Sequence, residues 1–342
     1  MLDQSQKVAI YMEASLNSDY GKMGFGVMRY IANPIVCVID STQAGKTVQE
    51  ITNQPFAYPV VDSVAKALEM GAQVLVLGTA PSGGRVPESW HAPLDEAIVG
   101  GMNIVNGLHD KLNVQFGELL GPNQWIWDVR QPAFTPKIAS AKAAELNNKR
   151  VLLVGTDMAI GKMTAGLEVY RFMKEQGVDT RFLATGQIGI TVTGQGIPLD
   201  AFKVDHACGA VETMVMENGK SDVLFIEGQG SLLHPGSSAT LSLMRGSCAT
   251  HLIMCHRAEM THLRHPITVK VPPINEFIAL NEALTSVCGS LTQAKTVGIA
   301  LNTAKLDDEG AKRAIANLED ETGLPVQDVV RYGAEKLANT LI

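Results

Sequence analysis

An α/β fold made of two doubly wound domains is predicted by the sequence, and three observations support it. Short apolar runs rich in Val and Ile alternate with helix-like stretches, as in βαβ units around a parallel sheet. The chain has 342 residues, which exceeds the usual size of one hydrophobic core and favours two domains. The alternation also restarts after an interruption near the middle of the chain.

The first part of the chain predicts a parallel sheet covered by helices. Helix-like periodicity is found at 63–70 and 90–100, and Gly or Pro marks most of the turns. The strand-like runs are 7–13, 35–40, 74–78, 103–107 and 125–129.

The interruption follows the last of these runs. The Ala/Lys-rich stretch 137–149 is typical of a helix that bridges two domains. We therefore expect an N-terminal domain over 1–140 and a C-terminal domain over 141–342. The second domain is predicted to be doubly wound because strand-like runs resume at 150–155, 181–186, 222–228, 251–256, 295–302 and 326–330.

Charge and composition exclude some classes of partner. The net charge is −7 and no block of Lys or Arg occurs, which argues against a nucleic-acid backbone or an anionic membrane surface as partner. Small anionic ligands remain allowed, because a local cradle of backbone N–H groups overcomes modest global repulsion. The sequence therefore predicts a small-molecule partner.

A cytoplasmic protein is expected from the cysteines and the N-terminus. The five cysteines are odd in number and form no CxxC pair, which fits a reducing compartment. The start of the chain is charged early and turns into strand-like sequence, unlike a signal peptide. No apolar run approaches the length needed to span a membrane.

The strongest motif opens the second domain. A buried-strand run ends at Gly155, a glycine-bounded loop follows, and a helix is expected from about Gly161. The pattern resembles a P-loop lengthened by one residue: its glycines let the backbone approach a phosphate, and Lys162 supplies positive charge. The expected cofactor contacts are Gly155, Thr156, Asp157, Met158, Ala159, Ile160, Gly161, Lys162, Met163 and Thr164.

One position departs from a magnesium-nucleotide P-loop. Such loops place Ser or Thr directly after the lysine to bind the ion, whereas Met163 stands there in this chain. Thr164 is about 100° further round the helix. The loop is therefore expected to hold the phosphates of a cofactor such as coenzyme A, which need not be hydrolysed.

The loop GTDMAIGK resembles that of the dethiobiotin-synthetase group of P-loop enzymes. IEGQG at 226–230 puts Glu227 just beyond a buried strand, where that group has an acidic residue. IALNT at 299–303 ends a strand with Asn302, whose amide is able to read an adenine edge.

A resemblance to the DgcN-type family covers nearly the whole chain. It is carried by GFGVMRY at 24–30, VIDSTQAGKT at 38–47, TGQIGI at 185–190, DHACGAVE at 205–212, IEGQGSLLHP at 226–235 and LNT at 301–303. The resemblance implies a Rossmann-like N-terminal domain, a P-loop NTPase-like C-terminal domain, and N-acetylation of D-glutamate by acetyl-CoA. Family habit also implies a homo-oligomer, most simply a dimer.

The resemblance implies roles for single residues. The P-loop would bind coenzyme A phosphates and Asn302 the adenine side, with the acetyl group near three catalytic candidates. Of these, Glu227 or His206 is the candidate base, and Gln229 the candidate donor to the oxyanion. Expected substrate contacts are Arg245, His234 and Asp157, with Arg257 or Arg264 as other carboxylate clamps.

Less specific interpretations stay open for these residues. Glu227 is equally suited to organising the P-loop through a water, Asp157 to capping the helix, and the two histidines to ordinary hydrogen bonds. Four histidines crowd 251–265 without a CxxC or HExxH companion, so no metal site is expected.

Two other function classes compete with an acetyltransferase. The first is an ATP-dependent ligase or kinase like dethiobiotin synthetase, which would require Mg²⁺ and release ADP. The second is a nucleotide-binding regulatory protein without turnover.

Overall fold

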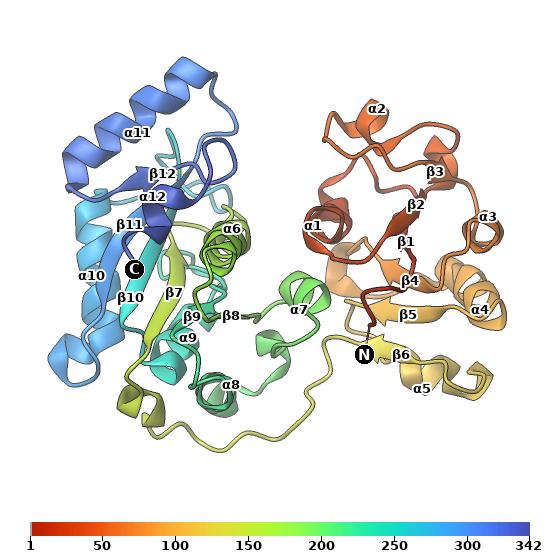
Figure 1. Cartoon of the computed structure of the whole chain (residues 1–342), viewed down its shortest axis with the longest axis horizontal. Coiled ribbons are helices and arrows are strands. Elements are labelled where there is room, and N and C mark those ends of the chain that lie inside the picture. The colour runs from red at the N-terminus through yellow and green to blue at the C-terminus, as the bar shows by residue number, and fades with distance from the viewer. Residues whose placement is uncertain (1) are drawn as a thin grey trace. The chain divides into compact units, whose positions relative to one another are not determined.

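The computed structural model describes residues 2–342, which form two compact units. The first unit contains the chain up to Gln131 together with Gln187–Pro198, and the second contains Pro132–Gly186 and Leu199–Ile342. Each unit has one six-stranded sheet, shown in Figure 1. The predicted α/β class, with two doubly wound sheets, is confirmed.

The sheet of the first unit is parallel throughout and has the order β3-β2-β1-β4-β5-β6. This is the strand order of a Rossmann-like fold. Five of its strands fall in the predicted runs, and the two-residue β3 was missed because it is too short to show a period. The strands are β1 Val8–Tyr11, β2 Ile35–Ile39, β3 Val60–Val61, β4 Val74–Leu77, β5 Asn103–Asn106 and β6 Ile126–Asp128.

Helices cover both faces of this sheet. One core lies between the sheet and α3, α4 and α5, where Trp90 packs edge-on against Tyr11. The helices of the unit are α1 Lys22–Tyr30, α2 Val48–Thr52, α3 Val64–Glu69, α4 His91–Val99, α5 Leu112–Phe116 and α7 Gln187–Thr193.

The helix α7 is contributed by the second half of the sequence and packs on α1 (green beside red in Figure 1). The contact is close: a Cβ atom on Gly26 would lie 2.5 Å from a methyl carbon of Ile188. A glycine on α1 is needed here because a side chain would push α7 away. The first unit is therefore completed only by a segment far along the chain.

The sheet of the second unit is also parallel, with the order β12-β11-β10-β7-β9-β8. The strand β7 is central, and the chain leaves it on one side to form β8 and β9 and returns to its other side as β10. The strands are β7 Lys149–Gly155, β8 Thr180–Leu183, β9 Val223–Ile226, β10 His251–Arg257, β11 Lys295–Asn302 and β12 Val326–Gln327.

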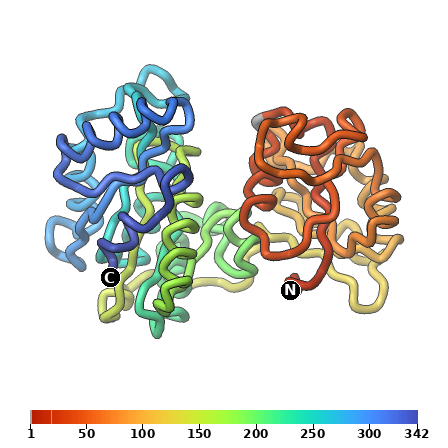
Figure 2. The backbone as a smooth tube through the Cα atoms, turned by 45° about the horizontal axis from the view of Figure 1, so that its top comes forward, coloured from red at the N-terminus to blue at the C-terminus, as the bar shows by residue number. Residues whose placement is uncertain are grey.

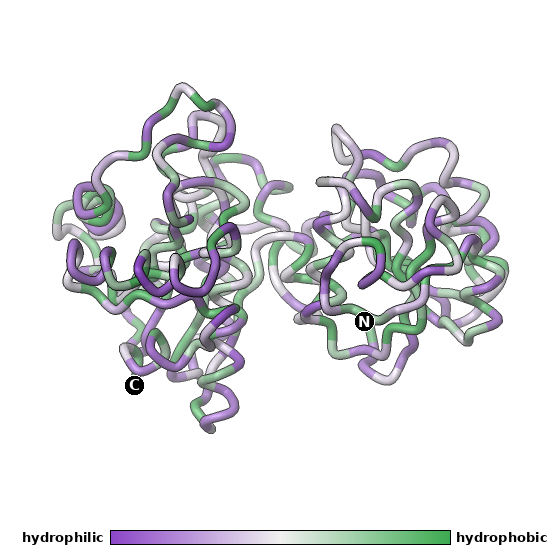
Figure 3. Tube along the Cα trace, turned by 90° about the horizontal axis from the view of Figure 1, so that it is seen from above, coloured by the Kyte–Doolittle hydropathy of each residue, from purple (hydrophilic) through white to green (hydrophobic). Residues whose placement is uncertain are grey.

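Two layers of helices enclose this second sheet. Successive contacts join α8, α9, α10 and α11 on one side, whereas α6 packs with α12. The strands of this sheet are mostly buried and hydrophobic. Figure 3 shows hydrophobic and hydrophilic residues mixed along the chain trace. The helices are α6 Lys162–Glu175, α8 Val204–Glu217, α9 Ala239–Ser247, α10 Ile274–Ser286, α11 Asp308–Thr322 and α12 Glu335–Ala338.

The bridging helix predicted over 137–149 is wrong. This stretch is extended, with one short 3₁₀ turn at Lys142–Glu145, as the yellow-green path in Figure 2 shows. Its backbone is bound by tertiary contacts, because the carboxylate of Glu212 on α8 accepts from the N–H groups of Ser140 and Lys142. These bonds replace the helical ones, so the Ala/Lys-rich composition did not decide the local structure.

Candidate functional site

The candidate site lies at the carboxyl edge of the second sheet. The loop 156–161 joins the end of β7 to the start of α6, as the motif predicted. Ligands of open α/β sheets bind outside the carboxyl ends of the strands, where the chain direction switches around a central strand. The strands β9, β10 and β11 end at the same edge and bring Glu227, His256 and Asn302 there.

Two glycines give the lysine its position. A Cβ on Gly228 would lie 1.7 Å from the carbonyl oxygen of Leu153, so no other residue fits without moving the backbone. The same Cβ would be 2.9 Å from Cδ of Lys162, and a Cβ on Gly155 would be 3.4 Å from that atom. The aliphatic part of the Lys162 side chain therefore passes close to the backbone at Gly155 and at Gly228.

Lys162 is a buried cation at the base of the loop. Its side chain is 6% exposed, and its Nζ donates to the carbonyl oxygen of Asp157 over 2.8 Å. Burial lowers the pKa of this ammonium, while Cys255, Asp157 and Glu227 act in the opposite direction. An anion above the loop would raise the pKa of this ammonium again, since a nearby opposite charge favours the charged form.

The loop presents backbone donors around this lysine. Within the described chain, the N–H groups of residues 159–164 donate no hydrogen bond to the protein. Gly161 caps α6 in the left-handed region, with φ of 109°, and Ala159 also has a positive φ of 52°. Unpaired N–H groups at the N-terminus of a helix form an anion-binding site.

The Asp157 side chain within the loop and side chains from two other strands fix the shape of the loop. Asp157 is 2% exposed and accepts from the N–H groups of Met158 and Arg264, at 2.6 and 2.9 Å. The guanidinium of Arg257 donates to the carbonyl of Ala159, and the Asn302 amide donates to that of Ile160. The loop is thus held open before any ligand binds.

The side-chain amide of Asn302 is hydrogen-bonded within the protein, unlike an amide that is free to bind the edge of a base. Its Nδ2 is 3.4 Å from the Ile160 carbonyl oxygen, and its Oδ1 accepts from the N–H of Ala304. Asp157 likewise has both oxygens bound by backbone donors. In this arrangement both side chains support the loop.

Glu227 is the most perturbed carboxyl group at this edge. It is 3% exposed, and its Oε2 accepts from the N–H groups of Thr185 and Gly186, at 2.8 and 3.1 Å. Burial raises its pKa to about 7, against the lowering effect of these two bonds and of Lys162. Oε1 accepts no hydrogen bond within the described residues, so this group has a free oxygen and titrates near neutrality.

Gln229 lies next to this carboxyl group. A Cβ on Gly186 would be 2.5 Å from Nε2 of Gln229 and 3.4 Å from Oε1 of Glu227, so the two side chains converge over the same glycine. The Gln229 backbone is fixed as well, because its carbonyl accepts from the Thr240 hydroxyl on α9. The predicted pairing of an acid/base group with an amide donor is therefore geometrically possible here.

The remaining predicted residues lie at different distances from this pair. His206 is on the first turn of α8, half-buried, and bonds to neither Glu227 nor Gln229. His234 lies in the loop after Gln229, where its Nδ1 accepts from the N–H of Gly236. Within the described residues, neither ring is hydrogen-bonded to Lys162.

Arg245 is not brought to this edge. It lies in the last turn of α9 and donates to the carbonyl of Leu284 on α10. The residues that follow it, Ser247 and Cys248, accept from Arg150 at the beginning of β7, whereas the P-loop follows the end of that strand. The strand β7 spans seven residues, roughly 20 Å at the usual rise.

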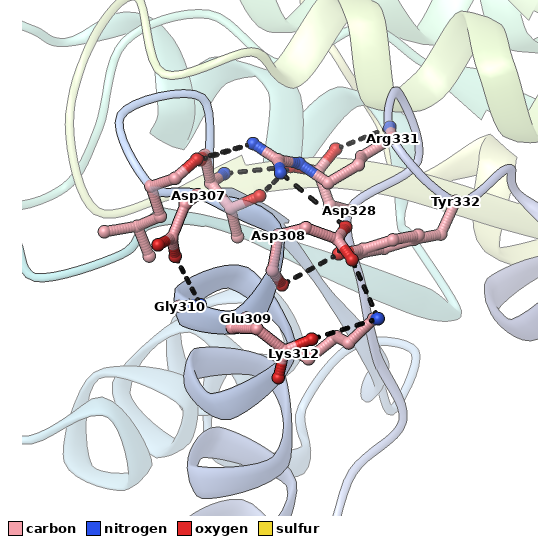
Figure 4. A network of polar contacts seen from close by, with 10 residues as sticks. Asp307, Asp308, Glu309, Gly310, Lys312, Asp328, Arg331 and Tyr332 are labelled. Atoms are coloured by element: carbon pink, nitrogen blue, oxygen red, sulfur yellow. Dashed lines mark hydrogen bonds and ion pairs between the residues drawn. The ribbon is translucent and has the colours of Figure 1, made fainter.

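A polar network that the sequence did not reveal stabilises the loops after β11 and β12. Asp328 accepts from the N–H and hydroxyl of Thr303, and Arg331 donates to the carbonyls of Thr303 and Leu306. Asp308 joins them through Lys312 and the Tyr332 hydroxyl (Figure 4). This network fixes the segment directly after Asn302. The only sequence signal was a scatter of polar residues after two strands.

The histidine-rich stretch does not assemble as a cluster. His256 bonds to the Thr156 hydroxyl, and His251 and His262 each bond to the threonine that precedes them. Among residues 2–342, no group of three His, Cys, Asp or Glu side chains is arranged to hold a metal ion.

Comparison with known proteins assigns a family. The C-terminal P-loop domain of unknown function DUF1611 matches residues 137–338, and the N-terminal Rossmann-like domain of the same family matches residues 41–132. The chain belongs to the DUF1611 family. Its two predicted domain types, Rossmann-like and P-loop, are those of this family.

Relatives with a named activity cover most of the chain. A protein from Pseudoalteromonas sp, named D-glutamate N-acetyltransferase, is 36% identical over 311 residues, 90% of each chain. One of the same name from Tritonibacter scottomollicae is 35% identical over 285 residues, 82% of this chain and 84% of the relative. The crystal structure of a DUF1611 family protein from Anabaena variabilis is 48% identical, with a TM-score of 0.94 over 98% of this chain and 99% of that one.

None of the helices in residues 2–342 is both long enough and apolar enough to cross a bilayer.

Proposed function

We propose that this protein transfers an acetyl group from acetyl-CoA to the amino group of a D-amino acid, D-glutamate first. The observation that carries the proposal is Glu227, a buried carboxyl group with a pKa of about 7 beside a phosphate-binding loop. The names of the two relatives support the choice of reaction and acceptor.

The loop fits the phosphates of the donor. The unpaired N–H groups at the start of α6 and the Lys162 ammonium at the base of the loop are suited to an anion, and coenzyme A carries phosphates of this kind. Bound there, acetyl-CoA supplies an activated thioester carbonyl. A thioether is a poor ligand for Mg²⁺, so Met163 favours a phosphate cofactor that is not hydrolysed.

The protein's own groups then handle the proton and the developing charge. The acceptor ammonium must lose a proton before its nitrogen attacks the thioester carbon, and the free Oε1 of Glu227 takes it. The C–N bond forms and the C–S bond breaks. The nitrogen loses two protons in all: Glu227 passes the first to solvent and the second, lost after the C–N bond has formed, to the departing thiolate. Gln229 Nε2 donates to the oxygen that becomes negative in between. Arg257, at the loop, pairs with an acceptor carboxylate.

The test measures thiol release from acetyl-CoA in EDTA with a panel of D- and L-amino acids. ATP with Mg²⁺ is assayed in parallel for ADP. We expect thiol release with D-glutamate and acetylation at its nitrogen, seen by mass spectrometry. ADP formation without thiol release would replace the proposal with the ligase or kinase alternative. If neither thiol nor ADP forms, the proposed acetyl transfer is contradicted.

A further inference from the structure

A cavity of about 320 Å³ lies in the second unit, apart from Glu227 and Gln229. It is bounded by the end of β10, by Leu301 on β11, and by one face of α11. The face is continuous, because its members recur at helical spacing: Gly310, Arg313, Ala314, Asn317, Leu318 and Glu321. The buried residues Ala311 and Ile315 hold α11 against the rest of the unit.

The lining combines an apolar wall with unpaired charges. Leu301, Leu318 and two alanines supply apolar surface. The three charged residues that line it, Arg313, Glu259 and Glu321, make no side-chain hydrogen bond or ion pair within residues 2–342. Glu259 also has a φ of 60°, a backbone conformation that a glutamate rarely adopts.

His256 adds no positive charge to this lining. Burial, with a smaller contribution from Arg257, lowers its pKa to about 4, so the imidazole is neutral at physiological pH. The lining therefore carries two carboxylates and one guanidinium. A dicarboxylate such as glutamate would add negative charge to a negative cavity, whereas a ligand with two cationic groups and one carboxylate would balance it.

We propose that this cavity binds a diamino acid, an α-amino acid whose side chain ends in a second cation. Its carboxylate pairs with Arg313, and its two cationic groups pair with Glu259 and Glu321. A cavity of about 320 Å³ suits a ligand of this size, at the small end of small-molecule sites. The proposal is independent of the proposed acetyl transfer, because it concerns other residues.

Occupancy of the cavity is coupled to the P-loop through His256. Its Nδ1 is 2.9 Å from the hydroxyl of Thr156, the residue that follows Gly155 in the loop. A ligand in contact with the ring is therefore one hydrogen bond away from the phosphate cradle. Diamino-acid binding should change acetyl-CoA affinity, and acetyl-CoA should change diamino-acid affinity by the same factor.

The experiment is calorimetric titration of the full chain, without acetyl-CoA, using the D and L forms of lysine and arginine. We expect one site, weakened by salt, with D-glutamate and N-acetyl-D-glutamate showing no binding that depends on the cavity. The double variant Glu259→Gln/Glu321→Gln should bind about fivefold to thirtyfold more weakly, since two exposed ion pairs are lost. Asp320→Asn, on the same helix but outside the lining, is the matched control and should bind normally.

Any of three results would overturn the proposal, the last two of which concern the variants. One is the absence of binding heat with all four probes at millimolar concentration, with circular dichroism showing a folded protein. The others are binding that the double variant leaves unchanged, and glutamate binding that Arg313→Gln abolishes. Acetyl transfer is measured separately, so its failure would leave this result unaffected.

Discussion

Both sheets are followed by loops with polar groups, but the hydrogen bonds of those groups differ between the two units. In the first unit, Asp40 follows β2 and accepts from the N–H groups of Ala14, Leu16 and Thr42. In the second unit, the loop after β7 leaves consecutive N–H groups unpaired, and Glu227 keeps one oxygen free. The carboxylate after β2 is satisfied by the protein's own backbone, whereas the edge of the second sheet leaves several N–H groups and one carboxylate oxygen for a ligand.

This difference shows that the fold alone does not create a site. In a Rossmann-like fold the acidic residue after the second strand often binds a ribose, but here Asp40 is 1% exposed and bound to the protein's own backbone. The GKT sequence at 45–47 follows the same pattern, because Thr47 caps the short helix α2 in a capping box. Only the second edge joins a lysine, unpaired donors and a perturbed carboxyl group.

The largest expected effect is on the rate of acetyl transfer when the free carboxylate of Glu227 is removed. Glu227→Gln keeps the shape of the side chain and removes the base, so acetyl transfer should fall by about 10²- to 10⁴-fold. Kinetics of thiol release provide the measurement. In the folded protein the pKa of Glu227 is raised to about 7, above the ordinary pKa of a glutamate. The folded state therefore loses stability as the pH rises from that ordinary pKa to about 7, because the buried carboxyl group must ionise. The variant should therefore be at least as stable as the wild type at pH 8, and a lower melting temperature there would indicate a structural role instead.

Two glycine-to-alanine variants, one in each unit, compare the cost of a steric clash with the cost of backbone strain. Gly228→Ala would place Cβ 1.7 Å from the Leu153 carbonyl oxygen, and we expect about 3 kcal/mol or more of destabilisation. Gly45→Ala, in the GKT sequence of the first unit, has open space but a φ of 88°, and should cost about 1 kcal/mol. Urea denaturation of both variants tests this, and equal midpoints would contradict the close approach at Gly228.

A lysine pair tests whether the GK sequence at 161–162 binds phosphate and the one at 45–46 does not. Lys162→Met keeps the aliphatic stem between the glycines and removes the charge. It should weaken acetyl-CoA binding by roughly tenfold to a hundredfold, the value of a hydrogen bond to a charged group. Lys46→Met is the matched control and should bind normally in calorimetry. A comparable loss in both variants would remove the distinction drawn between the two edges.

The smallest expected effect is a shift in pH dependence. The base must be ionised, so kcat/KM should fall as the pH drops below about 7. Because Lys162 lowers the pKa of Glu227, Lys162→Met should move this acid limb to higher pH, in addition to weakening binding. Profiles measured at saturating acetyl-CoA test the shift. A limb that stays in place would mean that the two groups do not interact in the working enzyme.

Strand and loop positions could be predicted from sequence because they depend on local patterns. The run that ends at Gly155 and the GK pair gave β7, the loop and α6 correctly. The bridging helix was predicted wrongly, because Glu212, about 70 residues away, binds that backbone. The raised pKa of Glu227 could not be predicted from the sequence either, because it depends on burial where the ends of three strands meet. Arg245 had the right chemistry for a clamp, but its position on α9 places it by the beginning of β7.

The excursion of Gln187–Pro198 into the first unit has a consequence for synthesis on the ribosome. The N-terminal sheet is complete once β6 has emerged, but α7, which covers α1, is translated about 60 residues later. During that interval the side of α1 at Gly26 is without the helix that packs on it. A nascent chain would therefore expose, for a defined time, a helix face that the folded protein covers. A gene fragment that stops at the end of the first sheet would encode a unit lacking one of its helices.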